Sequence, residues 1–395
     1  MTPKNFLCIS EEFKGASFMT ALKAMGHRVF LLTKEAERHA NWPREAIDEI
    51  FFRPETKSAP HDRQSLVEGT AWLMRNHGID RIVALDDFDV EDAALLREEF
   101  RIPGMGQTTA RYFRDKLAMR MRARTFGIPV PAFSPLFRKS ELERFCGAHA
   151  GPYVIKPRSE ASAAGIEKVA DLAEALRVFE RLGESSYRYL VECFAPGTVY
   201  HVDALVQDGA LEFVRSSAYV DPPLTIVRGG GLFQTRMLEL ASAESAELAQ
   251  LTTRVMDAFG MRYSASHTEF IRDDAGRFLF LETSSRVGGA YISNMVHHAT
   301  GIDLWAEWAR IEAAELTGRE IELPRAGDGY GAVVLRAITE ERADRSLFEG
   351  EAVREAVREV IDKPYHAGAV LAGATHSSVT EAQLEIARRL TERYG

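Results

Sequence analysis

The first hundred residues alternate between short apolar runs and longer stretches in which apolar positions recur at helical spacing. A short apolar run predicts a buried strand, and helical spacing predicts a helix that packs one face on a sheet. The expected strands are Phe6–Ser10, Val29–Thr33 and Ile82–Leu85, and the expected helices are 18–25, ending near Gly26, and Ser65–Asn76. This order predicts a small parallel α/β layer of Rossmann-like topology. Because the GxGxxG fingerprint is absent, we do not expect this layer to bind a dinucleotide.

The pattern changes after Pro103-Gly104, where a long helical run is predicted over Ala110–Phe126. The later expected elements are the strands Tyr153–Lys156 and Tyr189–Glu192, helices near Leu172–Leu182 and Ala246–Phe259, and a helix-rich tail containing the apolar segment Ala367–Ala374. At 395 residues the chain exceeds what one core usually holds, so two or three domains are expected.

The composition limits the class of function. A formal charge of −9 argues against nonspecific nucleic-acid binding, which needs a basic face. Six basic residues do gather on one predicted helix, and we interpret most of them as solvated surface: Arg111, Arg114, Lys116, Arg120, Arg122 and Arg124. The three cysteines form no CxxC pair, and no apolar stretch approaches ~18 residues. We therefore expect a cytoplasmic protein without a membrane partner.

Lys156 ends an apolar strand and precedes a loop that contains Ser159, Ser162 and Gly165. A cation that faces small residues and backbone donors suits a polyphosphate ligand. Taken alone, these residues are better explained by a surface lysine before a loop.

Two glutamates lie on either side of the turn at Asp273–Gly276. If Asp274-Ala275 forms a tight hairpin, Arg272 faces Arg277, and Glu282 faces His267. Glu269 then lies diagonal to Glu282, at roughly 7–8 Å between backbones. Two carboxylates this close on apolar strands favour a cation between them, with magnesium the obvious candidate. A one-residue slip in register would instead turn one glutamate to solvent.

Two further loops carry arginine and glycine. Arg286, Gly288 and Gly289 follow Glu282, and arginine can clasp a carboxylate or phosphate while glycines let backbone amides approach an anion. A loop over Pro222–Gly231 contains Arg228 and three consecutive glycines, which suits either a mobile cover or a flexible linker.

Taken together, these residues resemble the ATP-grasp superfamily, in particular its carboxylate–amine ligases of the biotin-carboxylase-like and L-amino-acid ligase type. The resemblance runs from about Ala110 to about Ala309 in four motifs in the family's order: DKL with GIPVP, VIKPRSEASAAGI, LVECFAPGTVYHVDAL, and HTEFI with ETSSRVGG. It implies an α/β (α+β) chain with an N-terminal Rossmann-like domain at 1–108, an ATP-grasp small subdomain at 109–187, and a large subdomain at 188–395.

The resemblance also implies roles for single residues. Lys116 and Lys156 would contact ATP phosphates, with Ser162 and Gly165 in the covering loop. Glu192 and the backbone of Cys193, Phe194 and Ala195 would read the adenine edge. Glu269, Glu282 and Ser284 would hold Mg²⁺, or Mn²⁺ in its place, with Ser284 replacing the usual asparagine and Val199 the usual ribose-binding glutamate. Arg286 would lie near the γ-phosphate and acyl group, and Gly288, Gly289 and Arg228 would line the substrate site.

The implied activity is ATP-dependent activation of a carboxylate as an acyl phosphate and its coupling to an amine, releasing ADP and phosphate. Amino acids are the preferred substrates on this resemblance, and related enzymes often form homodimers. Two alternatives remain open: a biotin-carboxylase-like carboxylase that phosphorylates bicarbonate, and a noncatalytic nucleotide-binding module.

Overall fold

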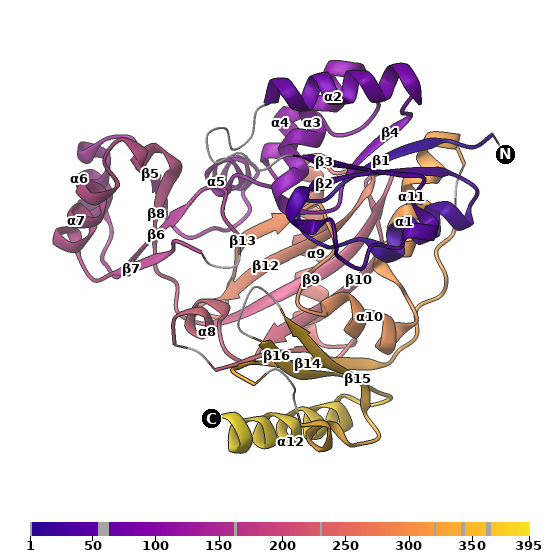
Figure 1. Cartoon of the computed structure of the whole chain (residues 1–395). Coiled ribbons are helices and arrows are strands. Elements are labelled where there is room, and N and C mark those ends of the chain that lie inside the picture. The colour runs from indigo at the N-terminus through magenta and orange to yellow at the C-terminus, as the bar shows by residue number, and fades with distance from the viewer. Residues whose placement is uncertain are drawn as a thin grey trace.

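The computed structural model describes residues 2–53, 63–161, 164–229, 231–319, 321–340, 344–360 and 365–395. Its strands form three sheets, and Figure 1 shows the small sheet standing apart from the other two. None of the helices in these ranges combines the length and apolar composition that a membrane span needs.

The N-terminal sheet is parallel and has the order β3-β2-β1-β4. Its strands are β1 (Asn5–Ile9), β2 (Arg28–Lys34), β3 (Glu49–Arg53) and β4 (Arg81–Ala84), and its helices are α1 (Ala16–Ala24), α2 (Arg63–Asn76) and α3 (Val90–Phe100). The predicted parallel layer is confirmed, but the sequence reading missed β3. That strand is only half-buried, so it lacks the continuous apolar run that marks β1 and β2.

The predicted long helix over Ala110–Phe126 is wrong, because the chain breaks into α4 (Gln107–Arg111) and α5 (Lys116–Thr125). Asp115 causes the break. Its side chain accepts hydrogen bonds from the backbone amides of Leu117 and Ala118, at 3.0 and 3.3 Å, and so caps α5. This cap fixes the position of Lys116 on the first turn of the helix.

The small sheet is antiparallel, has the order β5-β8-β6-β7, and is covered by two helices. Its elements are β5 (Phe133–Pro135), α6 (Lys139–Ala148), β6 (Tyr153–Pro157), β7 (Glu167–Val169), α7 (Leu172–Leu182) and β8 (Tyr189–Cys193). Lys156 therefore lies near the end of a central strand.

The large sheet has eight strands in the order β13-β12-β9-β10-β11-β14-β16-β15. The strands are β9 (Thr198–Gln207), β10 (Ala210–Tyr219), β11 (Leu232–Met237), β12 (Ser264–Arg272), β13 (Phe278–Ser284), β14 (Tyr330–Ile338), β15 (Val353–Val360) and β16 (Tyr365–Gly373). The remaining helices are α8 (Pro223–Gly229), α9 (Ala243–Phe259), α10 (Ile292–Thr300), α11 (Leu304–Thr317) and α12 (His376–Tyr394), with short 3₁₀ helices at 35–37, 44–46, 87–89, 183–188 and 345–348.

The two faces of the large sheet pack on different helices. Val202, Phe270 and Phe280 pack against α5 and α9, whereas Leu205 and Ala265 on the opposite face belong to the core shared with α10 and α11. The predicted helix-rich tail is wrong in part, because Ala367–Ala374 falls mainly in β16. A short apolar run suits a buried strand as well as a buried helix, and pairing with β14 and β15 decides it here.

Candidate functional site

The candidate metal ligands lie on one face of the large sheet, at its β13 edge. In the register of β9, β12 and β13, His201 lies opposite Glu269, which in turn lies opposite Glu282. Asp203, His267 and Ser284 form the neighbouring row. Because directly opposed residues project from the same face, the strands bring all six side chains onto one surface.

The predicted register of the β12–β13 hairpin is wrong. A β-bulge follows Glu269, so Leu281 is the extra residue on β13, and Arg272 pairs with Phe278 rather than Arg277. Glu269 consequently lies directly opposite Glu282 instead of diagonal to it. Such pairs have Cβ atoms roughly 4.5–5.5 Å apart, so the bulge brings the two carboxylates closer than the sequence suggested.

The oxygen atoms around these glutamates fit a magnesium ion. Glu282 faces Lys116 at 2.8 Å, and Glu269 accepts a hydrogen bond from the Tyr219 hydroxyl at 3.0 Å. Ser284 is buried, and within the described ranges its hydroxyl has no hydrogen-bond partner. Two carboxylates beside an unpaired hydroxyl form the all-oxygen donor set that Mg²⁺ prefers.

Five charged side chains from α5, β6, β8 and β13 form what we call the lysine–glutamate network: Lys116, Arg120, Lys156, Glu192 and Glu282. Lys156 lies 2.7 Å from one Glu192 oxygen, and Arg120 lies 2.6 Å from the other. Lys116 also donates to the Glu160 carbonyl at 2.8 Å. Of the six basic residues interpreted mostly as solvated surface, Lys116 and Arg120 are buried, whereas the other four are exposed or half-buried.

The charges in this network depend on one another. Burial lowers the pKa of Lys156 to about 8, although Glu192 opposes that shift. Burial would raise the pKa values of both glutamates, but the facing cations hold them below the usual range. At neutral pH three cations therefore face two carboxylates, which leaves an excess positive charge suited to an anion.

The segment proposed to read adenine begins at the end of β8 and continues to Ala195. The backbone amides of Cys193 and Phe194 donate to the carbonyls of Ala132 and Pro152, both at 2.9 Å. A base would therefore meet the carbonyls of this segment or the amide of Ala195. Gly165 has a left-handed backbone conformation (φ +67°), whereas Ser162 lies outside the described residues.

Arg286 is held by a residue that the sequence reading did not select. Its guanidinium forms an ion pair with Asp87, with Nε 2.9 Å from Oδ2, and donates to the Val287 carbonyl. Burial would raise the pKa of Asp87, but Arg286 holds it below the usual range. Asp87 follows the end of β4, and acidic residues at the carboxyl end of a parallel strand were the signal that could have found it.

Gly288 and Gly289 differ in the space that surrounds them. A Cβ atom on Gly288 would lie 2.8 Å from an Asp203 oxygen and 2.9 Å from Nδ1 of His267, whereas Gly289 has open space. Only Gly289 thus leaves room for a ligand beside its backbone.

Predicting a loop over Pro222–Gly231 was wrong for most of its length, because Pro223–Gly229, including Arg228, forms α8. Proline is favoured in the first turn of a helix.

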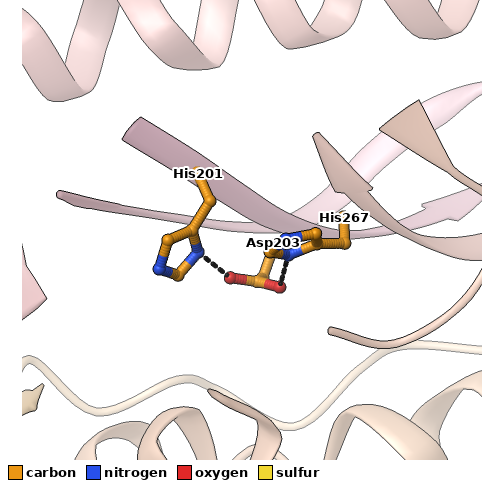
Figure 2. A group of neighbouring side chains, drawn as sticks. All are labelled: His201, Asp203 and His267. Carbon is orange, nitrogen blue, oxygen red and sulfur yellow. Dashed lines mark hydrogen bonds and ion pairs between the residues drawn. The ribbon is translucent and has the colours of Figure 1, made fainter. Parts of the chain in front are cut away.

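Figure 2 shows the histidine cluster, which we define as His201, Asp203 and His267. Each Asp203 oxygen meets the Nδ1 atom of one histidine, at 2.8 Å for His201 and 2.9 Å for His267. The other ring nitrogen of His201 meets the Thr235 hydroxyl at 2.6 Å. Burial would lower the pKa of His267, but Asp203 and Glu269 raise it to about 9. A protonated His267 balances the buried Asp203, so this cluster is satisfied without an ion.

The three sheets and the site at the edge of the largest define an ATP-grasp fold. The structure superposes on the L-amino acid ligase from Bacillus licheniformis with a TM-score of 0.75, covering 98% of this chain and 97% of that chain at 18% identity. At this identity, the likeness establishes the fold.

Sequence comparison adds relatives of one chemical type. The chain is 27% identical to the L-arginine-specific L-amino acid ligase of Bacillus subtilis over 233 residues, 57% of this chain and 56% of that protein. It is 23% identical to a D-alanine–D-alanine ligase of Neisseria gonorrhoeae over 187 residues, 47% of this chain and 61% of that protein. The matches thus span less than two thirds of either relative, and no family model matches the chain. The predicted resemblance to ATP-grasp carboxylate–amine ligases is confirmed.

Proposed function

We propose that this protein is an ADP-forming ligase that uses MgATP to activate a carboxylate as an acyl phosphate and couples it to an amine. The observation that carries the proposal is that Lys116 pairs with Glu282, which lies directly opposite Glu269, while Lys156 is close enough to lower the pKa of Glu282. Both relatives named above join amino acids, which supports amino acids as the carboxylate and the amine. A cytoplasmic location and a homodimer belong to the same proposal.

In this mechanism each charged group binds one part of the reactants. Lys156 and Lys116 exchange their glutamate partners for the phosphates of ATP, a charge-assisted contact in each case. Glu269, Glu282 and Ser284 hold Mg²⁺, which when bound offsets negative charge on the phosphates. Arg286 stabilises the charge that develops on the transferring phosphoryl group.

The reaction balances without covalent modification of the protein. A carboxylate oxygen attacks the γ-phosphorus, the bond to the β-phosphate oxygen breaks, and ADP leaves. The amine nitrogen then attacks the acyl carbon and phosphate leaves, while the nitrogen loses a proton to solvent. The result is an amide, ADP and phosphate.

The test is phosphate release from MgATP across a matrix of amino acids and small carboxylic acids, alone and in pairs, with bicarbonate included. The proposal predicts ADP formation that requires one acid and one amine. Turnover with bicarbonate alone would support the carboxylase reading, and nucleotide binding without turnover for any pair would support the noncatalytic module.

A further inference from the structure

Arg120 is the most deeply buried member of the lysine–glutamate network, with a side chain that is 0% exposed. It projects from α5 one turn after Lys116 and meets two strands. Its Nε lies 2.6 Å from Glu192 of β8, and its guanidinium donates to the carbonyl of Leu281 on β13. One side chain thus contacts both the small sheet and the edge strand of the large sheet.

The contact between Arg120 and Glu192 affects whether Lys156 can leave Glu192 to bind a phosphate. Glu192 is 4% exposed and has two cationic partners, one for each carboxylate oxygen. If Lys156 moves to a phosphate, Glu192 still keeps Arg120. Without Arg120 the same movement would leave a buried carboxylate with no counterion, which is strongly unfavourable. Arg120 thereby removes a penalty that would otherwise oppose nucleotide binding.

The second contact bears on the metal ligands. Leu281 is the extra residue of the β-bulge that places Glu282 opposite Glu269. An extra residue in a bulge is left out of the regular ladder, so another group has to hold its backbone in place. Here that group is Arg120, which donates a hydrogen bond to the Leu281 carbonyl.

We propose that Arg120 is a positioning residue that acts as the standing counterion of Glu192, freeing Lys156 for phosphate, and that fixes the bulge preceding Glu282. This role rests on the proposed function, because it assigns phosphate to Lys156 and metal to Glu282. Arg120 touches neither reactant and acts through those two side chains.

The experiment is a double-mutant cycle read as MgATP affinity by calorimetric titration, using the full chain. Arg120→Met is expected to weaken binding about tenfold or more in the wild-type background. In a Glu192→Gln background the same change should cost about threefold or less, because no buried carboxylate is left without a partner and only the contact with the Leu281 carbonyl is lost. Arg120→Lys, which keeps the charge, should bind within about threefold of wild type but require more Mg²⁺ for phosphate release.

Arg124→Met is the matched control, since Arg124 lies on the exposed side of the same helix. Melting temperatures are recorded for all variants. If Arg120→Met does not fold, the comparison moves to Glu192→Gln against the double variant, in which the buried pair is removed together.

An equal loss of affinity on removing Arg120 in both backgrounds would overturn the counterion role, as would wild-type affinity in folded Arg120→Met. A folded double variant that binds more than about tenfold more weakly than Glu192→Gln would do the same. Wild-type protein that does not bind MgATP would instead overturn the proposed function, and this role with it.

Discussion

The lysine–glutamate network reaches the large sheet through Glu282, close to the histidine cluster on β9 and β12, yet the charges of the two groups are satisfied in different ways. In the network, the ion-pair partner of Lys156 and that of Lys116 are glutamates that a phosphate could replace. In the cluster, each Asp203 oxygen contacts one histidine, and Gly288 packs so closely on Asp203 and His267 that no room is left for a Cβ atom. Buried charge therefore marks a ligand site only where the partners can be exchanged, and mutations should separate the two regions.

The largest effect is expected for Glu282→Gln, which should lower phosphate release on the order of 1,000-fold because a metal ligand is lost. The melting temperature should change little, since the Glu282 side chain is 36% exposed. Steady-state assays with thermal denaturation check both parts. Wild-type turnover in this variant would remove Glu282 from the metal site.

Asp203→Ala should show the opposite pattern, losing stability first. It leaves two buried histidines without their shared carboxylate, which should cost about 3 kcal/mol in the free energy of unfolding. Urea denaturation measures this loss, with Glu282→Gln as the matched control. A stability equal to that of wild type would show that the cluster is not the closed structural unit described here.

Lys156→Ala should weaken MgATP binding by on the order of 1.5–3 kcal/mol, because a charge-assisted phosphate contact is lost. Calorimetric titration gives the value directly. Lys139→Ala is a suitable comparison, because Lys139 on α6 forms an exposed ion pair with Glu180 on α7 at 3.6 Å, and neither residue belongs to the proposed site. Unchanged affinity in Lys156→Ala would contradict the phosphate role.

The smallest effect is expected with pH. Burial lowers the pKa of Lys156 to about 8, so its charged form is lost as the pH rises through that value. MgATP affinity should be level near neutral pH and then fall by up to about tenfold per pH unit above about pH 8. Lys156→Ala should flatten this slope, and an identical slope in that variant would assign the titration to another group.

Local sequence signals were sufficient where an element is determined by its own residues. The helix predicted near Leu172–Leu182 is confirmed as α7, because Asp171 caps its first turn and Gly183 follows its last residue. Asp115 caps α5 in the same way and so separates it from α4. This cap was not predicted because the apolar residues before and after Asp115 follow helical spacing.

The features that could not be predicted from the sequence depend on contacts between segments that are far apart in the chain. The bulge at Leu281 depends on its contact with Arg120, which is 161 residues away in the chain. Arg120 pairs with Glu192, and Arg286 pairs with Asp87, each across a long stretch of sequence. The assignments of Lys116, Lys156, Glu269 and Glu282 to phosphate and metal stay predictions until a ligand is bound.

The central claim is that a carboxylate is activated by phosphoryl transfer, and heavy-oxygen labelling tests it most directly. The acid of the productive pair is labelled in both carboxylate oxygens, and phosphate released in ordinary water is analysed by mass spectrometry. Attack on the γ-phosphorus predicts that one labelled oxygen per turnover appears in the phosphate, with ADP as the nucleotide product. Label-free phosphate, or AMP as the product, would contradict an acyl-phosphate mechanism.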